Sequence, residues 1–311
     1  MKTKKTIFPS NLHTHTFYCD GKNNVEDYIL TAIEKGFTSV GLSGHSFTAF
    51  DTEPCMTKQG TQEYLKELKE LKEKYKNKMQ VYIGIEADFY TGYNRETDKE
   101  MGLDFRIGSV HYVKDREKDE YYCVDNTPEI LKYGIKNYAD EDERAFIEAY
   151  FDNIVEMVHT QKPDIIGHLD LVRKFNKDLK YFDENADWYK KKVEYVLDEI
   201  AKTNAIIEIN TGGMSRGWTQ TPYPSIPILE RILAKNIPIT ISSDAHETKN
   251  IDFYFEESLE IARKVGFKSV KILDGGEFRD FEIWFKKIFI ERLKKIELYS
   301  VFYKIKIKKR R

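Results

Sequence analysis

Cysteine is scarce in this sequence, and the three that occur, Cys19, Cys55 and Cys123, form no C-x-x-C pair. Such an odd and scattered set argues against a disulfide framework and favours a reducing cytoplasm. No apolar run reaches the roughly 18 residues that a membrane-spanning helix requires. The first residues also lack the long apolar core of a cleaved signal peptide. We therefore expect a cytoplasmic protein with no membrane partner.

Phosphate-binding loops and dinucleotide fingerprints are missing as well, and no linker rich in Pro, Gly or Ser divides the chain. The 311 residues are 41% hydrophobic and 33% charged, a composition that can bury a substantial core. The net charge of −2 is unevenly distributed: residues 284–311 hold 11 Lys and Arg against 2 Glu, which leaves −11 for residues 1–283. These numbers predict one folded domain, 1–283, and a basic extension, 284–311. The acidic domain disfavours nucleic acid as a partner.

Short apolar runs alternate with longer amphipathic stretches along the domain. This alternation is typical of parallel β–α units, and seven strands in one undivided chain favour a single closed α/β barrel. We expect the segment Lys114–Asp140 to be an active-site loop. The predicted strands are Ile7–His15, Ser39–His45, Gln80–Phe89, Phe105–Val113, Asp164–Leu171, Ala205–Thr211 and Pro238–Asp244. The predicted helices are Val25–Lys35, Thr61–Lys78, Glu141–Thr160, Ala186–Thr203, Ser225–Lys235 and Phe255–Val265.

Polar residues fall near the ends of these strands, two residues apart and therefore on the same face. The carboxyl ends of barrel strands build active sites, so these residues should converge on one mouth. Six of the 7 histidines belong to this set, and His159, on a predicted helix, is the exception. Buried imidazoles and carboxylates need a cation, and this mixture suits Zn²⁺, Mn²⁺ or Fe. The residues on this face are His13, His15, Ser43, His45, Glu86, Asp88, Ser109, His111, His168, Asp170, Glu208, Asn210, Asp244 and His246.

Seven fragments carry a resemblance to a known family. They are HTHTFYCDG, GLSGHS, GIEADF, GSVHYV, IIGHLDLVRKF, EINTGGMSRG and SSDAH, in this order along the chain, and the resemblance runs from about Leu12 to about Gly266. The set resembles the PHP superfamily, named for polymerase and histidinol phosphatase, and within it the monofunctional histidinol-phosphate phosphatases. The resemblance implies a distorted (β/α)7 barrel with a trinuclear metal centre. It also implies hydrolysis of a small phosphorylated amino alcohol, L-histidinol phosphate, to L-histidinol and phosphate in histidine biosynthesis.

The resemblance further implies how the ligands are divided. One metal would be held by His13, His15, Glu86 and Asp244, and Glu86 would bridge to a second metal held by His111 and His168. A third metal would take Asp20, His45 and His246. Many relatives have histidine where this chain has Asp20, and an alternative role for Asp20 is to cap the turn that follows it. We expect two to three divalent transition metals.

Two arginines are candidates for binding the substrate phosphate. The resemblance assigns this role to Arg216 in the NTGGMSRG fragment, where the glycines allow close backbone approach. Arg173 is a second candidate because its planar fork suits phosphate oxygens, although a surface ion pair explains it equally well. Asp244, His246 or water could protonate the leaving alkoxide. The roles of Glu208 and Asn210 stay open.

Three alternatives compete with a monoester phosphatase. A nuclease or other phosphoesterase of the same superfamily would use the same metals but would need a basic groove. A barrel of the amidohydrolase type would supply a bridging lysine at a central strand, where this chain has Glu86 and His111. A non-catalytic scaffold that binds a phosphorylated ligand would not need all nine ligands. The sequence carries no signal for the oligomeric state.

Overall fold

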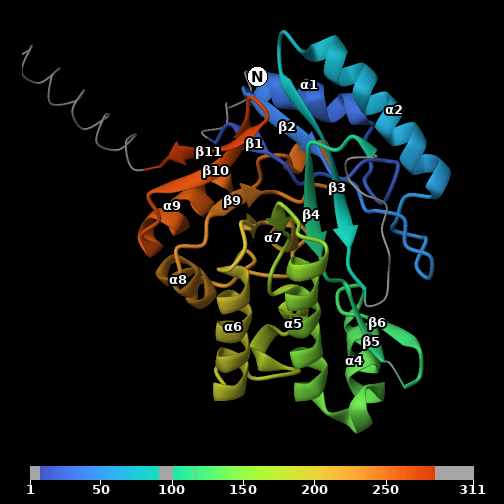
Figure 1. Cartoon of the computed structure of the whole chain (residues 1–311), viewed down its shortest axis with the longest axis vertical. Helices are drawn as coiled ribbons and strands as arrows, with labels where there is room; N and C mark the ends of the chain where they lie inside the picture. Colours follow the sequence, from blue (N-terminus) through green and yellow to red (C-terminus); the bar gives the residue numbers. More distant parts are fainter. Residues whose placement is uncertain (1–7, 91–100, 116, 284–311) are drawn as a thin grey trace, which may run out of the picture.

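Parallel strands form the centre of the computed structural model, which describes residues 8–90, 101–115 and 117–283 (Figure 1). Seven of them pair in the order β1-β2-β3-β4-β7-β8-β9. The strands are β1 (Ser10–Asn11), β2 (Ser39–Leu42), β3 (Gln80–Asp88), β4 (Phe105–Ser109), β7 (Ile165–Ile166), β8 (Ile206–Asn210) and β9 (Ile239–Ser242). Every pair in this sheet is parallel, which confirms the predicted α/β barrel.

The first and last strands meet just beyond their ends, and this contact nearly closes the barrel. Thr14 and Ala245 form a parallel bridge. The backbone N–H of His15 donates to the carbonyl of Ala245 at 2.9 Å, and the N–H of Ala245 donates to the carbonyl of His13 at 3.3 Å. The two ends of the sheet, about 230 residues apart in the sequence, are thus held side by side by main-chain hydrogen bonds.

Amphipathic helices cover the outside of the barrel, and each of the six predicted helices is confirmed within a few residues. Their buried faces pack on the apolar side of the strands, and polar side chains cap several helix starts; the Thr57 hydroxyl, for example, accepts from the N–H of Gly60. They are α1 (Val25–Lys35), α2 (Lys58–Tyr75), α5 (Glu143–Thr160), α6 (Asp187–Ile200), α8 (Ile226–Ala234) and α9 (Phe255–Val265).

The region after β4 differs from the prediction. The predicted strand Phe105–Val113 is broken after Ser109, and the chain turns into an antiparallel hairpin of β5 (Tyr112–Asp115) and β6 (Glu120–Cys123). Helix α4 (Pro128–Asn137) follows, so the predicted loop Lys114–Asp140 is largely regular structure. The expectation of an irregular loop was wrong, because this hairpin is short and lies outside the barrel, where no β–α alternation marks it.

Smaller elements complete the described chain. A hairpin of β10 (Ser269–Asp274) and β11 (Glu277–Glu282) follows α9 beside the barrel. The short turns are η1 (Ala139–Glu141), η2 (Leu171–Arg173), η3 (Lys177–Leu179), α7 (Gly212–Ser215) and η4 (Thr248–Asn250). The predicted basic extension, 284–311, lies outside the described residues. Within them, no helix combines the length and apolar character needed to traverse a bilayer.

Candidate metal centre

The predicted ligands follow the carboxyl ends of the barrel strands. Glu86 lies within β3, whereas His45 comes three residues after β2 and His168 two residues after β7. Asp244 stands just past β9 with a backbone φ of +48°, a left-handed conformation in which Asp is enriched and which turns the chain at this point. The strands are therefore shorter than predicted, and most candidate ligands sit on the first residues of the connections that follow them.

Glu86 is the centre of the cluster. Its Oε2 lies 3.3 Å from Nε2 of His13, 3.4 Å from Nε2 of His15 and 3.0 Å from Nδ1 of His45. Its other oxygen, Oε1, lies 3.0 Å from Nε2 of His168 and 3.7 Å from Nε2 of His111. One carboxylate thus faces five imidazoles, which come from four different segments of the barrel because His13 and His15 both follow β1.

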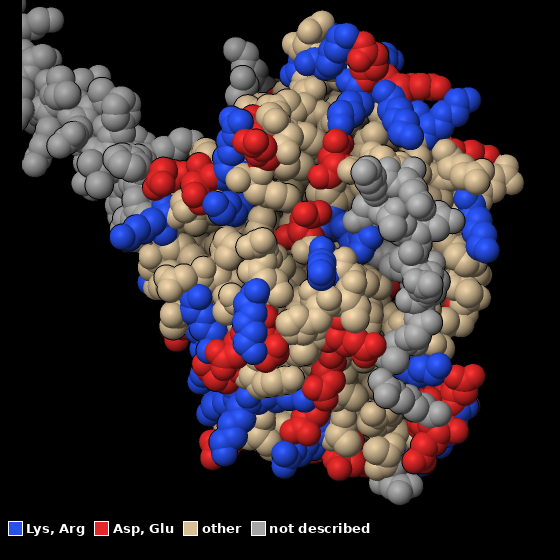
Figure 2. Space-filling view, in the orientation of Figure 1, with Lys and Arg blue, Asp and Glu red and all other residues tan. Residues whose placement is uncertain are grey.

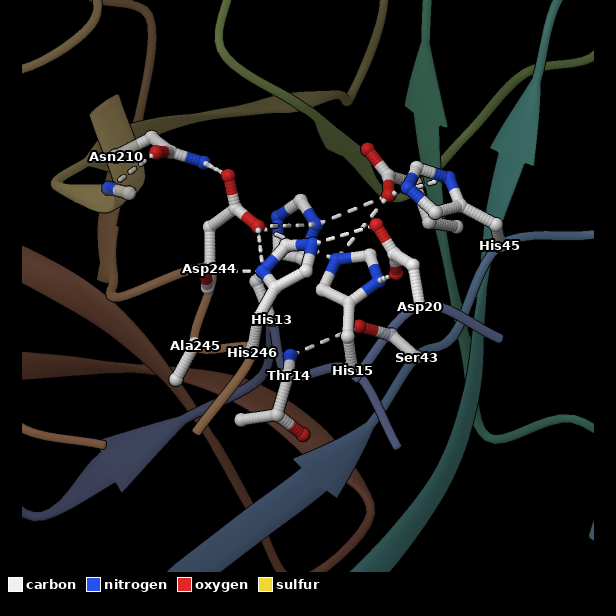
Figure 3. A network of polar contacts seen from close by, with 12 residues as sticks. His13, Thr14, His15, Asp20, Ser43, His45, Asn210, Asp244, Ala245 and His246 are labelled. Carbon is white, nitrogen blue, oxygen red and sulfur yellow. Dashed lines mark hydrogen bonds and ion pairs between the residues drawn. The ribbon is translucent and has the colours of Figure 1, made fainter. Parts of the chain in front are cut away.

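A second group of side chains adjoins this cluster on its exposed side (Figure 3). Asp20 lies 3.0 Å from Nε2 of His246 and 3.4 Å from Nδ1 of His15. The imidazoles of His15 and His246 are stacked with centroids 4.1 Å apart. Asp244 Oδ1 lies 3.2 Å from Nε2 of His15 and 3.5 Å from Nδ1 of His246. The structure therefore brings all nine predicted ligands together, Asp20 among them.

Buried polar atoms in this cluster lack hydrogen-bond partners, which is the main sign that a cation belongs there. They include Nε2 of His13, Nε2 of His15, Nδ1 of His45 and Oε2 of Glu86. A buried polar atom without a partner is costly, and a divalent metal satisfies such nitrogens and oxygens together. Ligand atoms of four groups lie close enough to share an ion: His13, His15 and Glu86; Glu86, His111 and His168; His15, Asp20, His45 and His246; and His45, Asp88 and His111. The residues fit a polynuclear metal site.

The pKa shifts of the metal-free protein describe the same electrostatic situation. Burial opposes protonation of His13, but the carboxylates of Glu208, Glu86 and Asp244 outweigh it and raise its pKa to about 10. Burial likewise opposes ionisation of Glu86, yet His45 and His13 hold its pKa well below the usual range. Without a metal, protons on the imidazoles would compensate the carboxylates. Metal binding replaces those protons and is therefore expected to weaken at low pH.

Two buried carboxylates stand behind the candidate ligands. Glu208 contacts Nδ1 of His13 with both oxygens, at 3.1 and 3.0 Å, and is fully buried. Asp88 Oδ1 lies 2.5 Å from Nδ1 of His111. In each case the other nitrogen of the imidazole faces Glu86, so the carboxylate fixes the ring and its tautomer. Asp88 is two residues from Glu86 on the same strand, so its side chain lies on the same face; this spacing is the sequence feature that indicates its place beside the cluster.

The two predicted phosphate-binding arginines lie in different places. Arg216 reaches the cluster: its Nη2 lies 3.1 Å from Oδ2 of Asp244, and its Nη1 donates to Nδ1 of His246 at 2.8 Å. Gly212 makes room for this arrangement, because a Cβ there would lie 2.4 Å from Asp244 Oδ2. The glycine accommodates a protein carboxylate, whereas the sequence suggested approach to a ligand.

Arg173 does not line the cavity in front of the cluster. Its Nε faces Asp170 at 3.7 Å and Glu184 at 3.4 Å, and its Nη2 donates to the Thr221 hydroxyl at 2.9 Å. The neighbouring Lys174 lines the cavity instead. The turn η2 explains the difference, because successive residues of a 3₁₀ turn point in different directions. The prediction that Arg173 contacts phosphate directly is thus not supported by its position.

The cavity has a volume of about 300 Å³ and two unlike sides. We call the first the metal wall, formed by Asp20, His45, Glu86, Asp88, His111, His168, Arg216, Asp244 and His246. We call the second the loop wall, formed by Asp51, Pro54, Cys55, Tyr112, Cys123, Asp125, Asn126, Leu171 and Lys174. The segment Lys114–Asp140, expected to lie at the active site, supplies Cys123, Asp125 and Asn126 to this wall. The sequence carried no signal for Asp51, Pro54 and Cys55, which belong to the irregular segment after β2. His159 lies elsewhere, exposed on α5 and paired with Glu199.

Comparison with known proteins places this architecture in a family. The model of the PHP domain matches residues 11–212, a span that includes seven of the nine candidate ligands. The chain belongs to the PHP domain family. Asp244 and His246 lie beyond the matched span but complete the same cluster in space.

Relatives of this PHP protein are similar over most of its length. A probable histidinol-phosphatase of Schizosaccharomyces pombe is 25% identical and covers 86% of this chain and 90% of its own. The histidinol-phosphatase of Bacillus subtilis is 26% identical, and the match covers 80% of this chain and 97% of the relative. Among solved structures, histidinol phosphate phosphatase from Lactococcus lactis, complexed with zinc, L-histidinol and phosphate, has a TM-score of 0.63 at 19% identity and covers 87% of this chain and 98% of its own. A Listeria monocytogenes protein has a TM-score of 0.71 at 22% identity, and the match covers 80% of this chain and 99% of that protein.

Proposed function

We propose that this PHP protein is a metal-dependent phosphomonoesterase that hydrolyses L-histidinol phosphate to L-histidinol and phosphate. The observation that carries the proposal is the cluster of nine candidate metal ligands, seven of which line one small cavity together with Arg216. The curated relatives named histidinol-phosphatases support the substrate, as does the Lactococcus lactis structure with L-histidinol and phosphate. A cavity of about 300 Å³ suits a small monoester.

We assign two to three divalent ions, Zn²⁺, Mn²⁺ or Fe, to the cluster. His13, His15, Glu86 and Asp244 would hold the first, while Glu86, His111 and His168 would hold the second. Asp20, His45 and His246 would hold the third. The chemistry that divalent metals supply at such a site is neutralisation of phosphate charge and activation of water for attack on phosphorus.

The side chains of the metal wall perform the remaining tasks. Arg216 donates to the phosphoryl oxygens and stabilises the charge that develops on them. Burial opposes ionisation of Asp244, but Arg216 and His13 outweigh it and hold its pKa well below the usual range. An ionised Asp244 orients Arg216 and does not protonate the leaving alkoxide. Burial, His15 and Arg216 likewise lower the pKa of His246 to about 4, so His246 is unprotonated at neutral pH and the proton comes from water.

The main competing function is a nuclease or other phosphoesterase of the same family. A polyanion would have to bring further phosphates past the loop wall, which contains Asp51 and Asp125. On the face seen in Figure 2, the coloured acidic and basic side chains are interspersed and form no continuous basic band. Both observations disfavour a nucleic acid and favour a single small monoester.

A substrate panel tests the proposal. Phosphate release from L-histidinol phosphate is compared with release from p-nitrophenyl phosphate, glycerol phosphate and a short single-stranded oligonucleotide, using metal-loaded protein. We expect kcat/KM for histidinol phosphate to exceed the others by about 100-fold or more, because a site built for a particular polar substrate rejects analogues that leave its groups unpaired. Equal or faster hydrolysis of the oligonucleotide would favour the nuclease.

A further inference from the structure

The two walls of the cavity differ in charge. On the metal wall, Arg216 and the cations that the cluster would hold would attract the phosphate end of a substrate. On the loop wall, the charged residues are Asp51, Asp125 and Lys174. Lys174 Nζ lies 3.1 Å from Oδ2 of Asp125 and donates to its backbone carbonyl at 2.6 Å, so these two charges compensate each other. Asp51 is therefore the residue that gives this wall a net negative charge.

Asp51 is an ionisable, half-buried residue of the loop wall. The Tyr112 hydroxyl donates to its Oδ2 at 2.9 Å, and among the described residues no Lys, Arg or His forms an ion pair with it. A carboxylate that accepts one hydrogen bond has further acceptor capacity for a cationic donor. Its position on the cavity lining makes it available to a bound cation.

Aromatic packing fixes the position of this carboxylate. The neighbouring Phe50 stacks on Tyr121 of β6 with centroids 3.9 Å apart and an interplanar angle of 6°. Its edge also meets Tyr112 at 4.9 Å and Tyr90 at 4.8 Å. Phe50 is 41% exposed, so this packing, and not burial in the core, attaches the segment after β2 to the β5–β6 hairpin. Asp51 is thereby held in place before any ligand arrives, which favours specific binding.

We propose that Asp51, positioned by Tyr112 and Phe50, binds the cationic group of an organic phosphate monoester whose phosphate lies on the metal wall. The substrate class is a small aminoalkyl or imidazolium phosphate, with the ammonium or ring N–H donating to Asp51. This inference rests on the proposed function, because it assumes that the metal wall hydrolyses phosphate monoesters. It adds a specificity-determining residue that acts on the organic part and takes no part in the chemical step.

A pair of matched substrates isolates the cationic contact. 2-Aminoethyl phosphate and propyl phosphate have the same chain length and differ in the terminal ammonium or methyl group. We expect wild-type kcat/KM to favour the aminoethyl ester, and Asp51→Asn to lower this preference by about 10- to 100-fold, the range for a hydrogen bond to a charged group. Calorimetric binding of 2-aminoethylphosphonate to the metal-loaded protein should weaken by a similar factor.

Two further variants control the interpretation. Glu53→Gln removes the same charge two residues away, on an exposed side chain that does not line the cavity, and should retain the wild-type preference. Asp51→Lys should invert the preference toward an anionic ester such as phosphoglycolate, a gain that a misfolded protein cannot produce.

The result separates this inference from the proposed function. If histidinol phosphate is a poor substrate but the aminoethyl preference depends on Asp51, the subsite stands and the named substrate falls. If histidinol phosphate is preferred and Asp51→Asn keeps the full aminoethyl preference, the subsite is overturned and the function stands. The subsite is also overturned if Glu53→Gln lowers the aminoethyl preference as much as Asp51→Asn does, because the effect is then a long-range one and does not come from a contact.

Discussion

The metal wall and the loop wall face the same cavity but are built in different ways. The metal wall stands on the carboxyl ends of parallel strands, and its imidazoles crowd around the single carboxylate of Glu86. The loop wall consists of connections held together by aromatic stacking and a few polar contacts. The rigid barrel thus carries the groups that a metal-dependent reaction requires, while groups that contact the organic part of a ligand come from segments that can change without altering the barrel.

The largest effect should come from the centre of the metal wall. Glu86→Gln keeps the shape of the side chain but removes the charge that faces His13, His15 and His45. We expect a loss of bound metal and a fall in kcat/KM on the order of 1,000-fold or more, since metal stabilisation of the transition state amounts to several kcal/mol. Metal analysis and phosphate release measure both. His159→Ala, on the outer surface, is the control and should change neither, so equal damage from it would contradict the assignment.

Arg216→Ala should have the next largest effect on turnover. Removing a charge-assisted contact to the phosphoryl group is expected to reduce kcat/KM by about 30- to 1,000-fold, or roughly 2–4 kcal/mol, while the metals stay bound. The observation against this role would be a variant that loses its metals along with its activity, because Arg216 would then act by holding Asp244 and His246.

Arg173→Ala should instead reduce stability, because it leaves the fully buried Asp170 without its cation. The free energy of unfolding should fall by about 3–5 kcal/mol at neutral pH. Burial raises the pKa of Asp170 to about 6 although Arg173 lowers it. Because the pKa is raised in the folded state, the charged form costs stability as the pH rises from about 4 through 6, and a protonated Asp170 needs no partner. The difference between variant and wild type should therefore be smaller at pH 5 than at pH 8 in denaturant titrations of metal-free protein. A difference that grows toward pH 5 would contradict this account.

A smaller effect is expected where the metal wall is supported from behind. Asp88→Asn keeps a hydrogen-bond acceptor beside Nδ1 of His111 but removes the charge. We expect metal affinity, measured by competition with a chelator, to fall about 10- to 100-fold. Thr48→Val removes a weaker contact to the same carboxylate, at 3.4 Å, and is the matched control. If Asp88→Asn retained wild-type affinity, Asp88 would have only a packing role.

Regular structure made the barrel and the metal wall predictable, whereas the loop wall depends on contacts that leave no periodic signal. Alternation along strands placed Glu86 and the histidines on one face, and helical periodicity located α1 and α9 to the residue. The same reasoning failed where the strand stops. The strand was predicted to continue to Val113, although β4 ends at Ser109 and the chain leaves the barrel there. Arg173 was predicted to contact phosphate, although the turn η2 directs its side chain away from the site. Asp51 could not be found because its position depends on Phe50 packing against a distant hairpin.

The bridge between Thr14 and Ala245 also constrains the order in which the protein folds during its synthesis. His13 and His15 lie near the start of the chain, and Asp244 and His246 directly follow its last barrel strand, β9. During synthesis, the metal centre cannot form until the ribosome has released about residue 246, although most of the barrel has already emerged. Ions bound across this seam stabilise only the closed barrel and so join the two ends of the domain without a covalent bond. In this chain the metals of a hydrolytic centre would also stabilise the closure of the barrel.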